Sequence, residues 1–180
     1  CHFSTICFYL PFFQNNPFVL PLLVEHVVQQ SKTDEISLLV DAYCGGGLFG
    51  LSAASRFNKI VGIEISREGF EGARTNARIN QIENSQFFLG DASSIFDELK
   101  EISEPAALVI DPPRRGCDPD FLRQAIEFGP QRIVYVSCDP ATQARDSQIL
   151  LEAGYQPILA QPFDLFPQTR HVENVLTLVR

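Results

Sequence analysis

The sequence contains no methionine, no Cys-x-x-Cys pair and, in residues 1–31, no lysine or arginine. Without an initiator methionine, we expect a piece of a longer protein, or a start that was processed or wrongly predicted. Without positive charge near the start, a secretory signal peptide is not expected. The apolar stretch there is interrupted by Gln14 and Glu25, which is not typical of a membrane span.

Positive charge is also scarce along the whole chain. Fourteen lysine and arginine residues face 22 acidic residues, so the formal net charge is −8. Proteins that hold nucleic acid through its phosphates usually carry a basic face. The chain is therefore not expected to bind RNA or DNA on its own. Any binding of nucleic acid should come from another region or from a local patch.

The five cysteines are odd in number and have no metal-binding spacing. This argues against a disulfide framework and against a zinc site, so no metal is expected. Reduced cysteines are the default inside the cell. The sequence therefore predicts an intracellular protein, in the cytoplasm, the nucleus or the mitochondrion.

Short apolar runs alternate with segments of helical periodicity, which indicates one α/β domain with a doubly wound sheet. Strands are expected at 37–41, 59–64, 86–89, 106–111, 133–136, 155–163 and 174–179, and helices at 18–30, 48–56, 68–80, 95–100, 120–128 and 142–153. Residues 164–173 leave no room for a crossover helix between the last two strands. The sequence thus predicts a seven-stranded sheet that ends in an antiparallel hairpin.

A glycine-rich loop follows the first expected strand. Gly45, Gly47 and Gly50 fit the G-x-G-x-x-G pattern, and the next strand ends at Glu64. Glycines there allow a ligand to approach the backbone closely, and an acid at the end of the second strand can accept a ribose hydroxyl. The alternative is a structural glycine turn with a solvated glutamate.

Acidic residues also follow other elements of the expected sheet: Asp41, Asp91 and Asp111. The anionic pyrophosphate of a dinucleotide is disfavoured near carboxylates. S-adenosyl-L-methionine carries a sulfonium and an ammonium and has no phosphate. We therefore expect S-adenosyl-L-methionine rather than NAD.

A lone thiol, Cys138, comes directly after the buried strand 133–136, and Pro140 stops the strand from continuing. In open parallel sheets, ligands bind at the carboxyl ends of the strands. Cys138 is therefore a candidate nucleophile, although a bare cysteine in such a strand is more often core packing. Two prolines after Asp111 would hold its carboxylate at a fixed angle.

Five motifs together resemble the RNA (uracil-5-)-methyltransferase family, particularly its eukaryotic tRNA branch. They are FFQNN (12–16), DAYCGGG (41–47), DPPRRG (111–116), VSCDPAT (136–142) and FPQTRHVE (166–173). The match covers residues 12–180. We therefore expect residues 1–13 to be an atypical, mispredicted lead-in and residues 14–180 to be the catalytic domain.

The resemblance implies a Rossmann-like class I S-adenosylmethionine-dependent methyltransferase fold, a tRNA substrate, an upstream RNA-binding region and a monomer. It implies that Cys138 is the nucleophile and Glu173 the base. The residues implied or expected to bind the cofactor are Gln14, Tyr43, Gly45, Gly47, Glu64, Asp91 and Asp111.

The chemistry of uracil explains the need for a thiol and a base. C5 of uracil is a poor nucleophile until a thiolate adds at C6, and a base must then remove the C5 proton. Where the family usually has asparagine after the cysteine, this chain has Asp139. A carboxylate beside the thiol is expected to disfavour the thiolate by like-charge repulsion.

Three other functions are compatible with parts of the pattern. An amino-group methyltransferase would use an acid-Pro-Pro loop and need no thiol. A catalytically silent fragment would bind the cofactor without turnover. A dehydrogenase would bind NAD, which the acidic loops disfavour.

Overall fold

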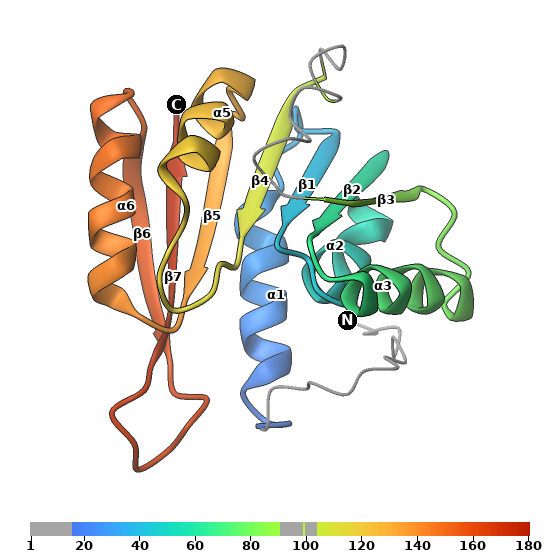
Figure 1. The fold of residues 1–180 in the computed structure, drawn as a ribbon, viewed down its shortest axis with the longest axis horizontal. Helices are drawn as coiled ribbons and strands as arrows, with labels where there is room; N and C mark the ends of the chain where they lie inside the picture. Colours follow the sequence, from blue (N-terminus) through green and yellow to red (C-terminus); the bar gives the residue numbers. More distant parts are fainter. Residues whose placement is uncertain (1–15, 91–98, 100–103) are drawn as a thin grey trace.

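The computed structural model describes residues 16–90, 99 and 104–180. Its centre is a seven-stranded sheet in the order β3-β2-β1-β4-β5-β7-β6 (Figure 1). The strands are β1 (Leu38–Ala42), β2 (Lys59–Glu64), β3 (Ser85–Leu89), β4 (Ala106–Ile110), β5 (Arg132–Ser137), β6 (Gln156–Phe163) and β7 (Glu173–Val179). Strand β7 is antiparallel to both β5 and β6. The predicted α/β sheet with a final antiparallel hairpin is confirmed.

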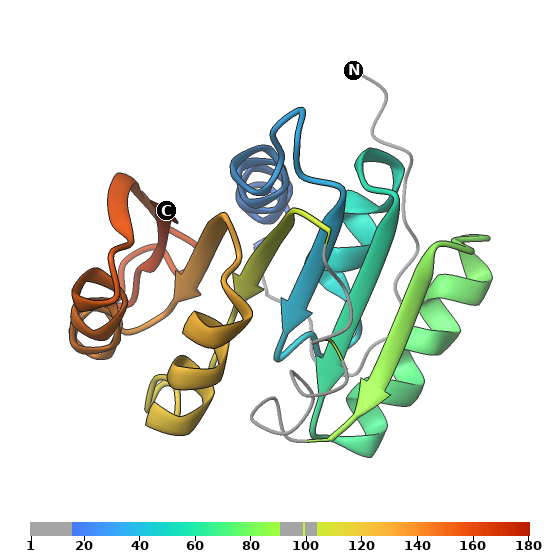
Figure 2. The ribbon, with the colours of Figure 1, turned by 90° about the horizontal axis from the view of Figure 1, so that it is seen from above.

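Helices cover both faces of the sheet. They are α1 (Leu20–Ser31), α2 (Leu48–Ala53) with the 3-10 turn η1 (Ala54–Arg56), α3 (Arg67–Ile79), α5 (Pro119–Phe128) and α6 (Pro140–Glu152). Figure 2 shows α1, α2 and α3 on one face and α5 and α6 on the other. This follows from right-handed crossovers that run in opposite directions on either side of β1.

The central strands β1 and β4 are buried at every residue. Apolar helices pack on both of their faces, which is why these strands appear in the sequence as continuous apolar runs. One core cluster packs beneath α1 and α2, and the other packs beneath α5 and α6.

Strands β1, β2, β4 and β5 are parallel, so their carboxyl ends lie at one edge of the sheet. The chain winds outward from β1 in one direction and from β4 in the other. Such a switch point opens a crevice at the carboxyl ends of the two strands. The loop of residues 164–172, between β6 and β7, lies at this same end (Figure 1).

Two helix starts differ by two residues from the expectation. The Asn16 Oδ1 atom accepts hydrogen bonds from the backbone N–H groups of Phe18 and Val19 (both 3.2 Å), and α1 begins only at Leu20. Helix α6 begins at Pro140, two residues earlier than expected, because Asp139 caps it. The expected helix 95–100 falls, apart from Leu99, outside the described residues. No described helix is long and apolar enough to cross a membrane.

Candidate active site

The glycine loop after β1 is joined to the end of β2 by Glu64. The Glu64 carboxylate accepts hydrogen bonds from the Gly45 N–H (2.8 Å) and the Ser66 N–H (2.7 Å). Gly45 (φ +53°) and Gly47 (φ +84°) both adopt left-handed backbone conformations. A methyl group built at Gly45 would meet no atom within 4 Å. The loop therefore presents open backbone to the crevice, beside the acid that the sequence singled out.

Tyr43 precedes these glycines and also has a positive φ of 62°. This conformation costs a non-glycine residue about 1–3 kcal/mol, so the surroundings must hold it. The Tyr43 ring packs edge-on against Phe121 of α5, with the ring centroids 5.2 Å apart. A contact with helix α5 therefore holds Tyr43 in place on the glycine-rich loop.

Asp41 is buried at the end of β1, with 1% of its surface exposed. Its Oδ2 atom accepts a hydrogen bond from the Gly50 N–H (2.8 Å), while Oδ1 has no partner among the described residues. Burial and the nearby Glu64 carboxylate raise the Asp41 pKa to about 7. An orphaned, buried carboxylate oxygen is well suited to a cationic ligand.

Asp111 follows β4 across the switch point and is half-buried. Burial raises its pKa to about 8, and the carboxylates of Glu173 and Asp41 contribute to the rise. These three acids from three strands are therefore close enough to interact. Their accumulated negative charge favours a positively charged ligand at this edge.

Cys138 lies directly after β5 and is partly exposed. Its thiol pKa is raised by burial first and then by the Glu173 and Asp111 carboxylates. The Arg114 guanidinium acts in the opposite direction, because a nearby cation favours the thiolate. Two carboxylates therefore oppose the thiolate form of Cys138, and one guanidinium favours it.

Glu173 is the first residue of β7 and is buried, with 4% of its surface exposed. Ser137 pairs with Asn174 in the antiparallel ladder. One residue further along the ladder toward the site, Cys138 on the β5 side therefore lies opposite Glu173 on the β7 side. Burial raises the pKa of Glu173, and Arg114 lowers it. The structure brings together Cys138, Glu173 and Asp111, which lie far apart in the sequence.

Arg114 is the site residue that sequence reasoning did not single out. One of its guanidinium nitrogens lies 2.7 Å from His171 Nδ1, in the loop between β6 and β7. The signal that could have identified it is its place in the Asp-Pro-Pro loop. Two prolines stiffen that loop and direct the next residues toward the strand end.

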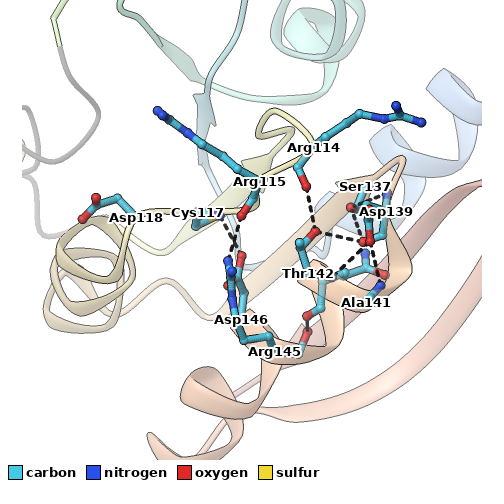
Figure 3. Close-up of polar contacts among 12 residues, drawn as sticks. Arg114, Arg115, Cys117, Asp118, Ser137, Asp139, Ala141, Thr142, Arg145 and Asp146 are labelled. Carbon is cyan, nitrogen blue, oxygen red and sulfur yellow. Dashed lines mark hydrogen bonds and ion pairs between the residues drawn. The ribbon is translucent and has the colours of Figure 1, made fainter.

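The effect expected of Asp139 on the thiol is instead exerted by Glu173 and Asp111. The Asp139 carboxylate accepts hydrogen bonds from the N–H groups of Ala141 (3.0 Å) and Thr142 (3.2 Å) at the start of α6 (Figure 3). The positive end of the helix dipole stabilises the carboxylate there.

Gln14 and Asp91 lie outside the described residues, so their roles stay predictions. Among the described residues, no cluster of three or more His, Cys, Asp or Glu side chains is arranged to hold a metal ion.

The strand order, the glycine loop after β1 and the acid after β2 define a Rossmann-like methyltransferase fold. The sequence model of the tRNA (uracil-5-)-methyltransferase family matches residues 8–180. The chain belongs to this family.

Individual relatives agree with this assignment. A tRNA (uracil(54)-C(5))-methyltransferase of Schizosaccharomyces pombe is 41% identical, over 99% of this chain and 36% of its own length. An uncharacterized RNA methyltransferase of Oceanobacillus iheyensis is 43% identical, over 93% and 37%.

One solved structure is also similar at the level of sequence. It is the Pyrococcus abyssi tRNA (uracil-54, C5)-methyltransferase in complex with S-adenosyl-L-homocysteine. It superposes with a TM-score of 0.80 at 32% identity, over 93% of this chain and 40% of that one. The chain thus spans 36% to 40% of the length of these three relatives.

Proposed function

We propose that this chain is the catalytic part of an S-adenosylmethionine-dependent enzyme that methylates uridine C5 in tRNA. The observation that carries the proposal is the meeting of the Cys138 thiol and the Glu173 carboxylate across β5 and β7. The family and the activity of its Schizosaccharomyces pombe relative support the same reaction and substrate. A thiol and a buried carboxylate at one crevice are what C5 methylation requires.

The residues present fit S-adenosylmethionine. The orphaned oxygen of Asp41 and the acid Asp111 suit a cation, and the Glu64 carboxylate suits a ribose hydroxyl. The open backbone at Gly45 leaves room for a ligand, and Tyr43 and Gly47 complete the loop. The cofactor supplies an electrophilic methyl group on its sulfonium.

Cys138 starts the reaction as a thiolate. The thiolate adds to C6 of uracil, and the electron pair of the C5–C6 double bond moves to give an enolate over C4 and C5. C5 then becomes the nucleophile that takes the methyl group. Arg114 stabilises the thiolate, since it is the group that lowers the Cys138 pKa.

Glu173 completes the reaction as the general base. It removes the C5 proton, the C5–C6 double bond forms again, and the C6–S bond breaks to return the thiolate. Burial raises the pKa of Glu173 above that of a solvated carboxylate. A raised pKa makes a carboxylate a stronger base for this proton transfer.

The decisive experiment uses tRNA that contains 5-fluorouridine, together with S-adenosylmethionine and this chain, on a denaturing gel. Fluorine replaces the proton that Glu173 must remove, so the RNA stays bonded to the sulfur. A covalent band that disappears in Cys138→Ala would support both the reaction and the nucleophile. An amino-group methyltransferase would give no band and would keep its activity in Cys138→Ala.

We further propose that a separate RNA-binding region provides the grip on tRNA, that the enzyme is a monomer and that it acts inside the cell. The net charge of −8 supports the first point. The gel is therefore run with the chain alone and with the family's upstream RNA-binding region added. Absence of a band in both, while the cofactor binds, would favour a catalytically silent protein and contradict the proposal.

A further inference from the structure

A buried carboxylate on α6 has no role in the reaction described above. Asp146 has 1% of its surface exposed. Its Oδ2 atom accepts hydrogen bonds from the Cys117 N–H (2.7 Å) and the Tyr135 hydroxyl (2.7 Å). Its Oδ1 atom accepts from Arg145 Nε (2.8 Å) and Nη2 (2.7 Å). A buried carboxylate with this many donors is a rigid anchor, because losing a donor leaves charge uncompensated.

The partners of this anchor reach the loop between β4 and α5, where Arg114 lies (Figure 3). Cys117 belongs to that loop, and Arg145 Nη2 also donates to the Arg115 carbonyl oxygen (2.9 Å). The Thr142 hydroxyl, one turn earlier on α6, donates to the Arg114 carbonyl oxygen (3.2 Å). Helix α6 therefore holds the main chain of the loop at three positions.

Gly116 shows how closely the loop packs on the anchor. A methyl group built on Gly116 would lie 2.5 Å from both Asp146 Oδ2 and Arg145 Nη2. Its φ of +79° also belongs to the region that favours glycine. The loop backbone thus rests directly on the Asp146–Arg145 pair, without an intervening side chain.

We propose that Asp146 is a positioning residue that holds the loop between β4 and α5 so that the Arg114 guanidinium stays near Cys138. The proposal rests on the proposed function, since it concerns the nucleophile of that reaction. The Arg114 side chain is exposed, so the placement of its main chain decides where the guanidinium can reach. Helix α6 is suited to this task because it begins two residues after Cys138.

Replacing Asp146 would change the pKa of Cys138 in two opposite ways. The direction of the measured shift therefore tells which of the two dominates. Removing a negative charge on its own would lower the pKa of Cys138, because a nearby anion opposes the thiolate. Releasing Arg114 would raise that pKa, because the guanidinium favours the thiolate. Positioning therefore predicts a rise where simple electrostatics predicts a fall.

The experiment is a titration of the Cys138 thiol in the 180-residue chain and in Asp146→Asn. The rate of alkylation by iodoacetamide is followed against pH by mass spectrometry of the peptide that contains Cys138. We expect the midpoint in Asp146→Asn to move up by about 0.5 to 1 pH unit, because the thiolate would lose part of the stabilisation by the Arg114 guanidinium. In an Arg114→Ala background, Asp146→Asn should cause no further rise.

Ser147→Ala is the matched control. Ser147 is buried next to Asp146 on the same helix, and its hydroxyl bonds only the Gln143 carbonyl oxygen among the contacts described (2.6 Å). It does not touch the loop in these contacts, so we expect its midpoint to equal that of the unmodified chain. A rise in Ser147→Ala equal to that in Asp146→Asn would overturn the proposal, because any disturbance of α6 would then suffice.

A folded Asp146→Asn variant with an unchanged or lower midpoint would also overturn the proposal. So would an equal rise with and without Arg114. If Asp146→Asn does not fold, Arg145→Ala replaces it, because it removes two of the hydrogen bonds to Asp146 and the one to the Arg115 carbonyl. Loss of the Arg145 cation alone would also raise the Cys138 pKa, so the Arg114→Ala background decides in this case: a rise of the same size without Arg114 would overturn the proposal. The titration needs neither RNA nor turnover, so failure of the proposed function would appear in the fluorouridine gel instead.

Discussion

The burial of Asp41 predicts that the ligand-free chain loses stability as the pH rises from 5 to 8. The Asp41 pKa is about 7 in the folded chain and 3.8 without burial. Between these values the folded chain keeps a proton that the unfolded chain has lost. A carboxyl group with a raised pKa therefore favours folding at low pH, and this contribution disappears as the pH rises through about 7.

The size of the effect follows from the two pKa values. One pH unit of difference corresponds to about 1.4 kcal/mol, so the full effect is about 4 kcal/mol. About 3 kcal/mol of this falls between pH 5 and pH 8, where the measurement is practical. The free energy of unfolding of a small domain is roughly 5–15 kcal/mol, so this change is a large share of it.

The test is urea unfolding followed by circular dichroism at pH 5, 6, 7 and 8. Asp41→Asn has nearly the same shape, cannot ionise and keeps an oxygen for the Gly50 N–H. We expect its free energy of unfolding to fall by about 3 kcal/mol less than that of the unmodified chain over this range. Asp34→Asn, at an exposed position, should leave the curve unchanged. Parallel curves for the unmodified chain and Asp41→Asn would refute the reasoning.

Three further predictions follow from the same edge of the sheet. S-adenosylmethionine should bind more tightly as the pH rises from 6 to 8, because Asp41 and Asp111 must lose protons to meet a cation; calorimetry showing no pH dependence and no proton release would contradict this. Glu173→Gln should abolish turnover and accumulate a covalent band with unmodified tRNA, because the base is missing. It should also lower the Cys138 pKa, because a nearby carboxylate is removed; a thiol titration showing a rise would count against this. Gly116→Ala should destabilise the chain by about 2–4 kcal/mol in urea unfolding, because its φ is positive and its methyl group would meet a buried carboxylate on α6; an unchanged midpoint would disprove the close packing.

Much of the fold could be predicted from the sequence because its signals are local. The apolar runs of β1 and β4 indicate buried parallel strands. The short segment 164–173 leaves no room for a crossover helix, so the final hairpin follows from chain length alone. The ends of helices are less certain, because a cap such as Asp139 depends on where one side chain points.

Part of the site could be predicted in the same way. Chain order places Asp41 near the end of a strand and Asp111 and Cys138 directly after strands, and parallel strands end at a common edge. The sequence therefore predicted that these residues would meet. The family resemblance supplied Glu173 as a fourth member, and the register of β7 against β5 explains why it lies beside the thiol.

The sequence by itself determined the alternation of strands and helices, the antiparallel end of the sheet and the residues at its carboxyl edge. Only the tertiary structure decided what those residues meet. Arg114 lies near enough to Cys138 to favour its thiolate, Asp139 caps α6, and Asp146 anchors a loop about 30 residues earlier in the chain. These contacts depend on the direction of single side chains across packed elements. Periodicity and spacing carry no information about that direction.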